Sequence, residues 1–129
     1  VQLFKSYRPD FADGCQRRDF LYAKDAVKMT VHLAEVESAG GLYNIGFGKA
    51  HTWLDLTHAL FAAMEREPRI EFIAMPAALQ PKYQYSTCAK MDRFRATGYS
   101  QPMTPLTAAV ADYVRNYLIP KKKLGDEGL

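Results

Sequence analysis

The sequence lacks any run of about 20 apolar residues, the length that an α-helix needs to cross a bilayer. It contains only two cysteines, Cys15 and Cys88, which lie far apart and form neither a CxxC pair nor a metal-type spacing. These absences argue against a membrane partner, a disulfide framework and a structural zinc site. We therefore expect reduced thiols in a cytoplasmic protein.

A basic folded surface is also missing. The formal net charge is +3, and the triplet Lys121, Lys122 and Lys123 accounts for it, because the other 14 basic residues balance 14 acidic ones. A protein that binds nucleic acid is expected to concentrate positive charge on one face of its fold. The sequence therefore predicts no nucleic-acid partner.

The length of 129 residues suits one hydrophobic core and is short for two ordinary domains. The chain opens at Val1 in strand-like residues without a methionine, which suggests a piece of a longer protein. We expect one domain over residues 1–119 and a polar, disordered tail over residues 120–129.

Hydrophobic spacing and turn residues predict an α/β fold with too few strands for a complete doubly wound sheet. In the helix expected over 24–36, Val27, Val31 and Ala34 recur at helical spacing and are predicted to face the core. Ala23, Met29 and Leu33 widen this apolar stripe. Thr52 is a candidate N-cap, and so is Thr104 with Pro105 at the first helical position. The expected strands cover 1–4, 19–22, 42–45 and 70–75, and the expected helices cover 24–36, 53–66, 88–96 and 106–117.

Three patterns could carry chemistry, and each has a simpler structural interpretation. Gly46-Phe47-Gly48 after a predicted strand is similar to a dinucleotide-binding turn, but His51 replaces the third glycine, so a structural turn is favoured. Tyr117 and Lys121 match Y-x-x-x-K formally, yet Pro120 interrupts the helix that the pair requires. The three histidines, His32, His51 and His58, form no metal or catalytic spacing and are expected to be non-catalytic.

Arg18 is the strongest single candidate for binding. It precedes a short aromatic and apolar run that leads into a predicted helix, and a guanidinium group can hold two phosphate oxygens at once. From the chemistry of the residues alone, an ion pair of Arg18 with Asp19 or Asp25 on a solvated edge is the favoured interpretation.

Resemblance to a known family favours the phosphate interpretation. Residues 18–25, RDFLYAKD, are similar to the RDF-[IV]-Y-V-x-D passage of extended short-chain dehydrogenases/reductases, the NAD(P)-dependent sugar-nucleotide epimerases and dehydratases. Residues 42–48, 83–87 and 89–99 follow in the order seen in the ADP-L-glycero-D-manno-heptose 6-epimerases of that family. The similarity extends to about Leu118.

The resemblance implies the C-terminal, substrate-binding part of a Rossmann-type enzyme that inverts C6 of an ADP-linked heptose for lipopolysaccharide core synthesis. NADP would bind to an N-terminal half that this chain lacks, so no cofactor, catalytic or metal-binding residue is expected here. Arg18 would contact the diphosphate of the ADP-sugar and Tyr83 would help to hold the nucleotide. By the same resemblance, the neighbouring end of the site would be lined by Phe4, Lys5, Ser6 and Tyr7.

Two departures weaken this transfer: Phe94 replaces a usual leucine, and the loop over residues 8–16 is of the longer type. The implied partners are the missing half, which would cover an exposed apolar surface, and further copies of the full enzyme in a homo-oligomer. The alternatives are another sugar-nucleotide epimerase or dehydratase, and a non-catalytic module that binds a nucleotide or a protein.

Overall fold

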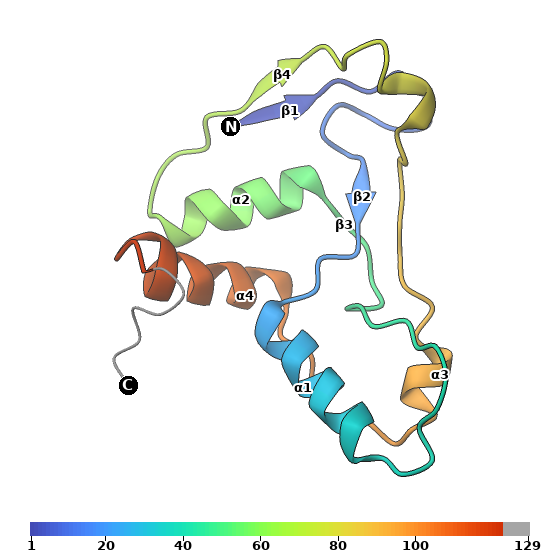
Figure 1. Ribbon diagram of the computed structural model, residues 1–129. Helices are drawn as coiled ribbons and strands as arrows, with labels where there is room; N and C mark the ends of the chain where they lie inside the picture. Colours follow the sequence, from blue (N-terminus) through green and yellow to red (C-terminus); the bar gives the residue numbers. More distant parts are fainter. Residues whose placement is uncertain (123–129) are drawn as a thin grey trace.

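The computed structural model describes residues 1–122 and has a mixed α/β architecture, as the sequence predicts (Figure 1). Residues 123–129, which include most of the predicted polar tail, lie outside the described residues. In chain order the elements are β1 (Gln2–Phe4), β2 (Arg17–Arg18), α1 (Ala23–Glu35), β3 (His51–Thr52), α2 (Trp53–Ala63), β4 (Glu71–Ile73), η1 (Gln80–Lys82), α3 (Asp92–Arg95), α4 (Leu106–Tyr113) and η2 (Val114–Leu118).

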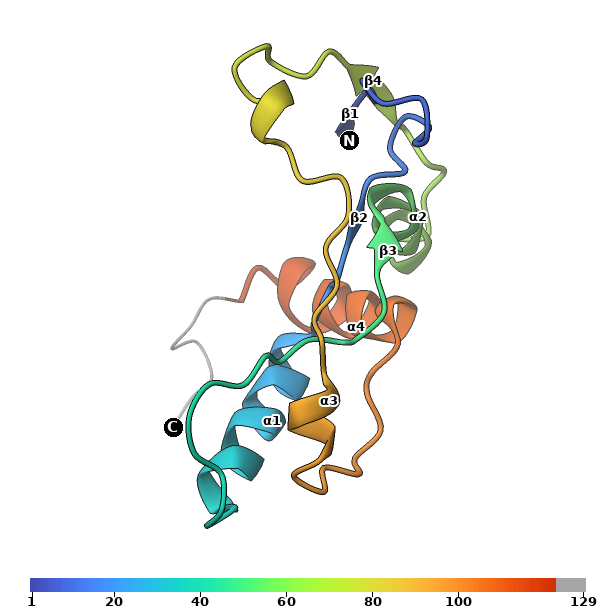
Figure 2. The ribbon, with the colours of Figure 1, turned by 90° about the vertical axis from the view of Figure 1, so that its right-hand side faces the viewer.

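The strands form two small pairs at one end of an elongated molecule, and α1 and α3 lie at the other end (Figures 1 and 2). β1 pairs in parallel with β4, and β2 pairs in antiparallel fashion with β3. On the other side of β2, Arg17 forms a parallel bridge with Ser86. β2 is therefore the central segment of three extended stretches, which fixes the direction of its side chains.

The helices α2 and α4 cross between the two ends and pack against each other through small buried residues (Figure 1). Ala59 and Ala63 of α2, and Ala109 of α4, are buried, as is Val114 in the turn that follows α4. Alanine at such a crossing lets two helix backbones approach closely. Within the described residues, no helix is long and apolar enough to span a membrane.

The start of α2 confirms the predicted cap. Thr52 Oγ1 accepts a hydrogen bond from the amide of Asp55 at 2.9 Å, and the Asp55 carboxylate accepts from the Thr52 amide at 2.8 Å. This reciprocal capping box satisfies two amides that the first turn would otherwise leave without partners. The capping box also fixes the direction in which α2, starting at Trp53, continues from β3.

The predicted core face of α1 is only partly correct. Val27 and Val31, at its centre, are 62% and 48% exposed, whereas Met29, at its predicted margin, is buried together with Asp25. Met29 packs with Met91 and Phe94 in a core cluster between α1 and α3. Full burial of an apolar side chain such as Phe94 stabilises a fold by about 1.5–3 kcal/mol. The helix turns this face inward because its buried carboxylate finds partners there.

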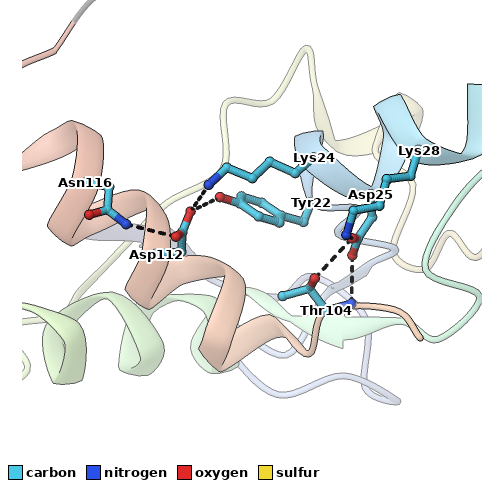
Figure 3. Close-up of polar contacts among 7 residues, drawn as sticks. All are labelled: Tyr22, Lys24, Asp25, Lys28, Thr104, Asp112 and Asn116. Atoms are coloured by element: carbon cyan, nitrogen blue, oxygen red, sulfur yellow. Dashed lines mark hydrogen bonds and ion pairs between the residues drawn. The ribbon is translucent and has the colours of Figure 1, made fainter. Parts of the chain in front are cut away.

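Asp25 is bound by Thr104, in the segment that leads into α4, and by Lys28 of α1 (Figure 3). Asp25 accepts hydrogen bonds from the backbone amide of Thr104 at 2.7 Å and from its hydroxyl at 3.1 Å, and Lys28 pairs with it at 3.3 Å. Burial alone raises the pKa of Asp25, but these three contacts outweigh burial and lower it. Thr104 thus binds Asp25 instead of capping α4, which begins at Leu106 with Pro105 as its N-cap.

Three predicted elements are shorter or absent. The strand expected over 19–22 lies earlier, at Arg17–Arg18, because only those residues reach a partner strand. Residues 42–45 are not a strand: no ladder partner exists for them within residues 1–122, and Leu42 is 82% exposed. The helix expected over 88–96 is reduced to Asp92–Arg95, with Met91 as its N-cap.

Candidate functional site

A cavity of about 390 Å³ lies where β1, β2 and the start of α2 meet. Its walls combine apolar and aromatic side chains with one charged group, the guanidinium of Arg18. Such a mixture of apolar walls with few polar groups is typical of small-molecule sites. The lining residues are Gln2, Leu3, Phe4, Gln16, Arg18, Trp53, Ile73 and Tyr83.

Arg18 is positioned by its own backbone and by an aromatic ring. One guanidinium nitrogen donates to the carbonyl oxygen of Arg17 at 2.7 Å, and the guanidinium carbon lies 5.1 Å from the centre of the Tyr83 ring. A guanidinium group over a tyrosine face gains a cation–π attraction and keeps its remaining N–H groups available. The half-buried Arg18 can therefore present donors to an anion in the cavity.

The alternative that Arg18 pairs with Asp19 or Asp25 is wrong. Asp25 is held by Thr104 and Lys28 at the other end of the molecule. Asp19 accepts from backbone amides, and no ion pair of Arg18 is present within residues 1–122. The positive charge of Arg18 thus has no carboxylate partner in this part of the chain.

Tyr83 completes one wall of the cavity with two neighbouring rings. It packs edge-on against Phe4, with ring centres 6.2 Å apart, and against Tyr85 at 5.4 Å. Tyr85 is buried and accepts a hydrogen bond from the amide of Tyr7 at 2.9 Å. These contacts anchor the segment around Tyr83 beside β1.

Of the six residues singled out by resemblance, three line the cavity and three do not. Phe4, Arg18 and Tyr83 lie on its walls, whereas Lys5, Ser6 and Tyr7 lie in the adjoining loop. Ser6 is engaged locally, since its amide donates to Asp13 at 2.7 Å and its hydroxyl donates to the Arg8 carbonyl at 3.0 Å. No contact tests the role of any of the six in binding, which stays a prediction.

The glycine-containing turn at residues 46–48 binds a carboxylate of the chain itself. Asp19 accepts hydrogen bonds from the amides of Phe47 at 2.8 Å, Gly48 at 3.1 Å and Ala89 at 2.9 Å. A Cβ on Gly46 would stand 2.6 Å from Asp19 Oδ2, so only glycine permits this approach. The turn amides are engaged by Asp19, so this turn does not fit the pyrophosphate of a dinucleotide cofactor.

The other sequence candidates have structural roles. His32 shares a 2.8 Å hydrogen bond with the hydroxyl of Thr97 and packs against Phe94. Lys121, at a positive φ of 55°, lies beyond the helical segment of Tyr117, so the Y-x-x-x-K geometry is absent. No group of three potential metal ligands occurs within residues 1–122.

A larger cavity, of about 550 Å³, lies between α2 and the start of α4. His51 and His58 are on its wall with Lys49, but Lys49 and His58 are exposed, and His51 stands 3.9 Å from the carboxylate of Asp55. It presents no buried polar group whose partner is missing. The smaller cavity at Arg18 is therefore the better candidate site.

A second polar cluster joins the start of α1 to α4 at the surface (Figure 3). Asp112 accepts hydrogen bonds from Lys24 at 2.8 Å, from Asn116 at 2.9 Å and from the hydroxyl of Tyr22. The hydrogen bond from Lys24, followed by that from Tyr22, lowers the pKa of Asp112 to about 2. The same contact with Asp112 raises the pKa of Lys24. The cluster is a structural clamp between helices.

Five lining residues were not among the predicted site residues: Gln2, Leu3, Gln16, Trp53 and Ile73. Gln16 could have been found by strand alternation, because residues two apart on an extended segment point to the same face, and Arg18 was already a candidate. Trp53 reaches the cavity because it is the first residue of α2, and α2 follows directly after β3, the strand that pairs with β2. No local sequence signal predicts that placement.

Comparison with known proteins gives consistent matches. A model of the NAD dependent epimerase/dehydratase family matches residues 5–46. Over 118 residues, the chain is 48% identical to the ADP-L-glycero-D-manno-heptose-6-epimerase of Nitratidesulfovibrio vulgaris (strain DP4), covering 92% of this chain and 36% of that protein. The enzyme of the same name from Fusobacterium nucleatum is 42% identical over 124 residues, covering 92% and 37%. The chain thus spans about a third of the length of these curated relatives.

Solved structures share the fold. UDP-N-acetylglucosamine 4-epimerase from Methanobrevibacter ruminantium superposes with a TM-score of 0.72 at 20% identity, covering 87% of this chain and 34% of that one. ADP-L-glycero-D-manno-heptose-6-epimerase from Helicobacter pylori superposes with a TM-score of 0.68 at 22% identity, covering 90% and 32%. These neighbours identify the architecture as part of a Rossmann-type epimerase fold.

Proposed function

We propose that this chain, which matches the NAD dependent epimerase/dehydratase family over residues 5–46, is the substrate-binding portion of an ADP-L-glycero-D-manno-heptose 6-epimerase. The complete enzyme would be an isomerase that interconverts ADP-D-glycero- and ADP-L-glycero-D-manno-heptose at C6 during lipopolysaccharide core synthesis in the cytoplasm. NADP would serve as its transient hydride acceptor. The 129 residues alone would bind substrate without catalysing its conversion.

One observation carries the proposal: an arginine without a carboxylate partner in the described residues lies on the wall of a cavity with apolar and aromatic sides. Arg18 stacks on Tyr83, and its guanidinium offers paired donors that suit a diphosphate. Phe4 and Trp53 provide flat apolar surface for the nucleoside. An ADP-sugar matches this cavity, because its anionic diphosphate would bind Arg18 and its nucleoside would pack against the apolar and aromatic walls.

The proposal is tested by calorimetric titration of ADP, with UDP as the competing nucleotide, into the wild-type chain, Arg18→Ala and Arg17→Ala. Arg17 is the matched control, since it neighbours Arg18 on the same strand but is exposed and does not line the cavity. We expect wild type and Arg17→Ala to bind ADP in preference to UDP, and Arg18→Ala to lose binding. Equal loss in both variants, or no ADP binding by wild type, would contradict the proposal.

The cofactor-binding half of the enzyme is the proposed partner. Relatives are about three times as long as the matched region, and here Val27 and Val31 on α1 and the extended Leu42 are exposed. Val27 and Val31, one turn apart on α1, present an apolar surface that the other half of the enzyme would cover.

Coexpression with the unmatched part of the Nitratidesulfovibrio relative tests this contact. We expect the two parts to elute together from a sizing column, and Val27→Asp to separate them. Leu79→Asp is the control, because Leu79 is exposed in the segment before η1 at the opposite end of the molecule. Coelution that survives Val27→Asp would show that the α1 face is not the contact.

A further inference from the structure

Gln16 is a buried side chain with one hydrogen-bonding function unused. It is 1% exposed, and it lines the same cavity as Arg18. Its Nε2 group donates to the carbonyl oxygens of Phe4 at 3.2 Å and Lys5 at 3.5 Å. No residue of the described chain donates a hydrogen bond to its Oε1 atom.

The two carbonyl oxygens also fix which end of the amide faces them. Carbonyl oxygens only accept, so the NH₂ end of Gln16 must face Phe4 and Lys5, and the reversed amide would set oxygen against oxygen. Oε1 therefore points away from β1. It is not among the buried polar atoms that lack a partner, unlike the indole nitrogen of Trp53, so Oε1 keeps contact with the cavity. The cavity thus contains an oriented hydrogen-bond acceptor that is open to a donor group of a bound ligand.

The spacing of Gln16 and Arg18 limits what that donor can be. The two residues are two apart on an extended segment, so they share a face with Cα atoms about 6.6 Å apart, and Arg17 points the other way. A ligand that spans both must present an anion and, at roughly that distance, an O–H or N–H group. In a nucleoside diphosphate, the ribose hydroxyl groups are separated from the phosphates by one ester linkage and the ring, which suits this spacing. The adenine amino group lies farther away.

We propose that Gln16 Oε1 accepts a hydrogen bond from a ribose hydroxyl group of the nucleotide whose diphosphate binds Arg18. This inference rests on the proposed function and extends it, because it makes Gln16 a residue that distinguishes ribonucleotides from deoxyribonucleotides. A site that leaves a buried acceptor without its donor discriminates strongly against the ligand that lacks the hydroxyl. The side chain needs no rearrangement to do so, because its amide is already oriented.

The test compares ADP, 2′-deoxy-ADP and 3′-deoxy-ADP by calorimetry on three proteins: wild type, Gln16→Met and Gln80→Met. Gln80 is the matched control, since its Nε2 also donates to a backbone carbonyl, that of Met75 at 3.0 Å, but it lies outside the cavity. We expect wild type and Gln80→Met to bind one of the deoxy analogues about 10-fold more weakly than ADP. In Gln16→Met that difference disappears.

The outcomes separate this inference from the function on which it rests. If wild type binds ADP, loses it in Arg18→Ala, and binds both deoxy analogues as tightly as ADP, the role of Gln16 is refuted and the proposed function stands. A difference that persists unchanged in Gln16→Met refutes it as well. If wild type binds no ADP, both fall together. The wild-type comparison requires no variant, so the inference can be refuted even if Gln16→Met does not fold.

Discussion

Replacing Asp19 with asparagine should destabilise the chain far more than the same change at an ordinary surface aspartate. Asp19 lies beside Arg18, yet its carboxylate binds three backbone amides from two distant segments, at Phe47, Gly48 and Ala89. The side chain thereby ties β2 to the glycine turn and to the segment before α3. Asparagine has nearly the same shape but only one acceptor oxygen.

The loss can be estimated from the hydrogen bonds. If the asparagine oxygen takes the place of Oδ2, it keeps the bonds from Gly48 and Ala89, and its NH₂ group faces the Phe47 amide, donor against donor. One bond to a charged acceptor is lost, about 1.5–3 kcal/mol, and the two that remain become neutral bonds, weaker by about 1 kcal/mol each. The expected decrease in the free energy of unfolding is therefore about 3.5–5 kcal/mol.

Urea unfolding followed by fluorescence measures this change. Trp53 is the single tryptophan and packs edge-on against Phe20, at 5.1 Å between ring centres, so its emission reports the tertiary structure directly. Asp10→Asn is the control, because Asp10 pairs only with Arg8 at the surface, where solvent screens an ion pair and its contribution to stability is small. A loss at Asp19 below about 1 kcal/mol, or equal to that of Asp10→Asn, would refute the reasoning.

Three further predictions follow from local geometry. Gly46→Ala should cost about 1–3 kcal/mol or more, because the new methyl group would stand 2.6 Å from Asp19 Oδ2, whereas Gly40→Ala meets nothing within 4 Å and should be nearly neutral by the same urea assay. Thr52→Ala removes the capping box of α2 and should lower stability by about 1 kcal/mol, measured as a lower urea midpoint with an unchanged m-value. The folded-state pKa of Asp25 lies below its unfolded value, so the contribution of its carboxylate to stability should be present above about pH 3.9 and should be lost as the pH falls through the folded-state pKa. In thermal melts between about pH 2 and 6, Asp25→Asn should therefore show a smaller loss of stability at low pH than wild type.

Much of the site was readable from local sequence. The cap at Thr52, the strand at residues 2–4 and the turn at Gly46 depend on residues within a few positions of one another, so spacing alone predicts them. Arg18 stood out for the same reason, as did the similarity of the passage that follows it to a known family. Sequence also favoured the structural interpretation of the glycine turn over a cofactor site, and the turn amides are indeed engaged by Asp19.

Only the tertiary structure decided which groups have partners. The contacts of Asp19 with Phe47 and Ala89 span 28 and 70 positions, and that of Asp25 with Thr104 spans 79. Periodicity treats a charged helix residue as exposed and valine as buried, yet α1 buries Asp25 and exposes Val27, because a distant amide and hydroxyl satisfy the carboxylate. The unused acceptor of Gln16 arises in the same way, since the carbonyls of Phe4 and Lys5 orient an amide that no local pattern singles out. Local spacing fixes which elements can form, and the pairing of polar groups across the fold determines which of their faces remain available to a ligand.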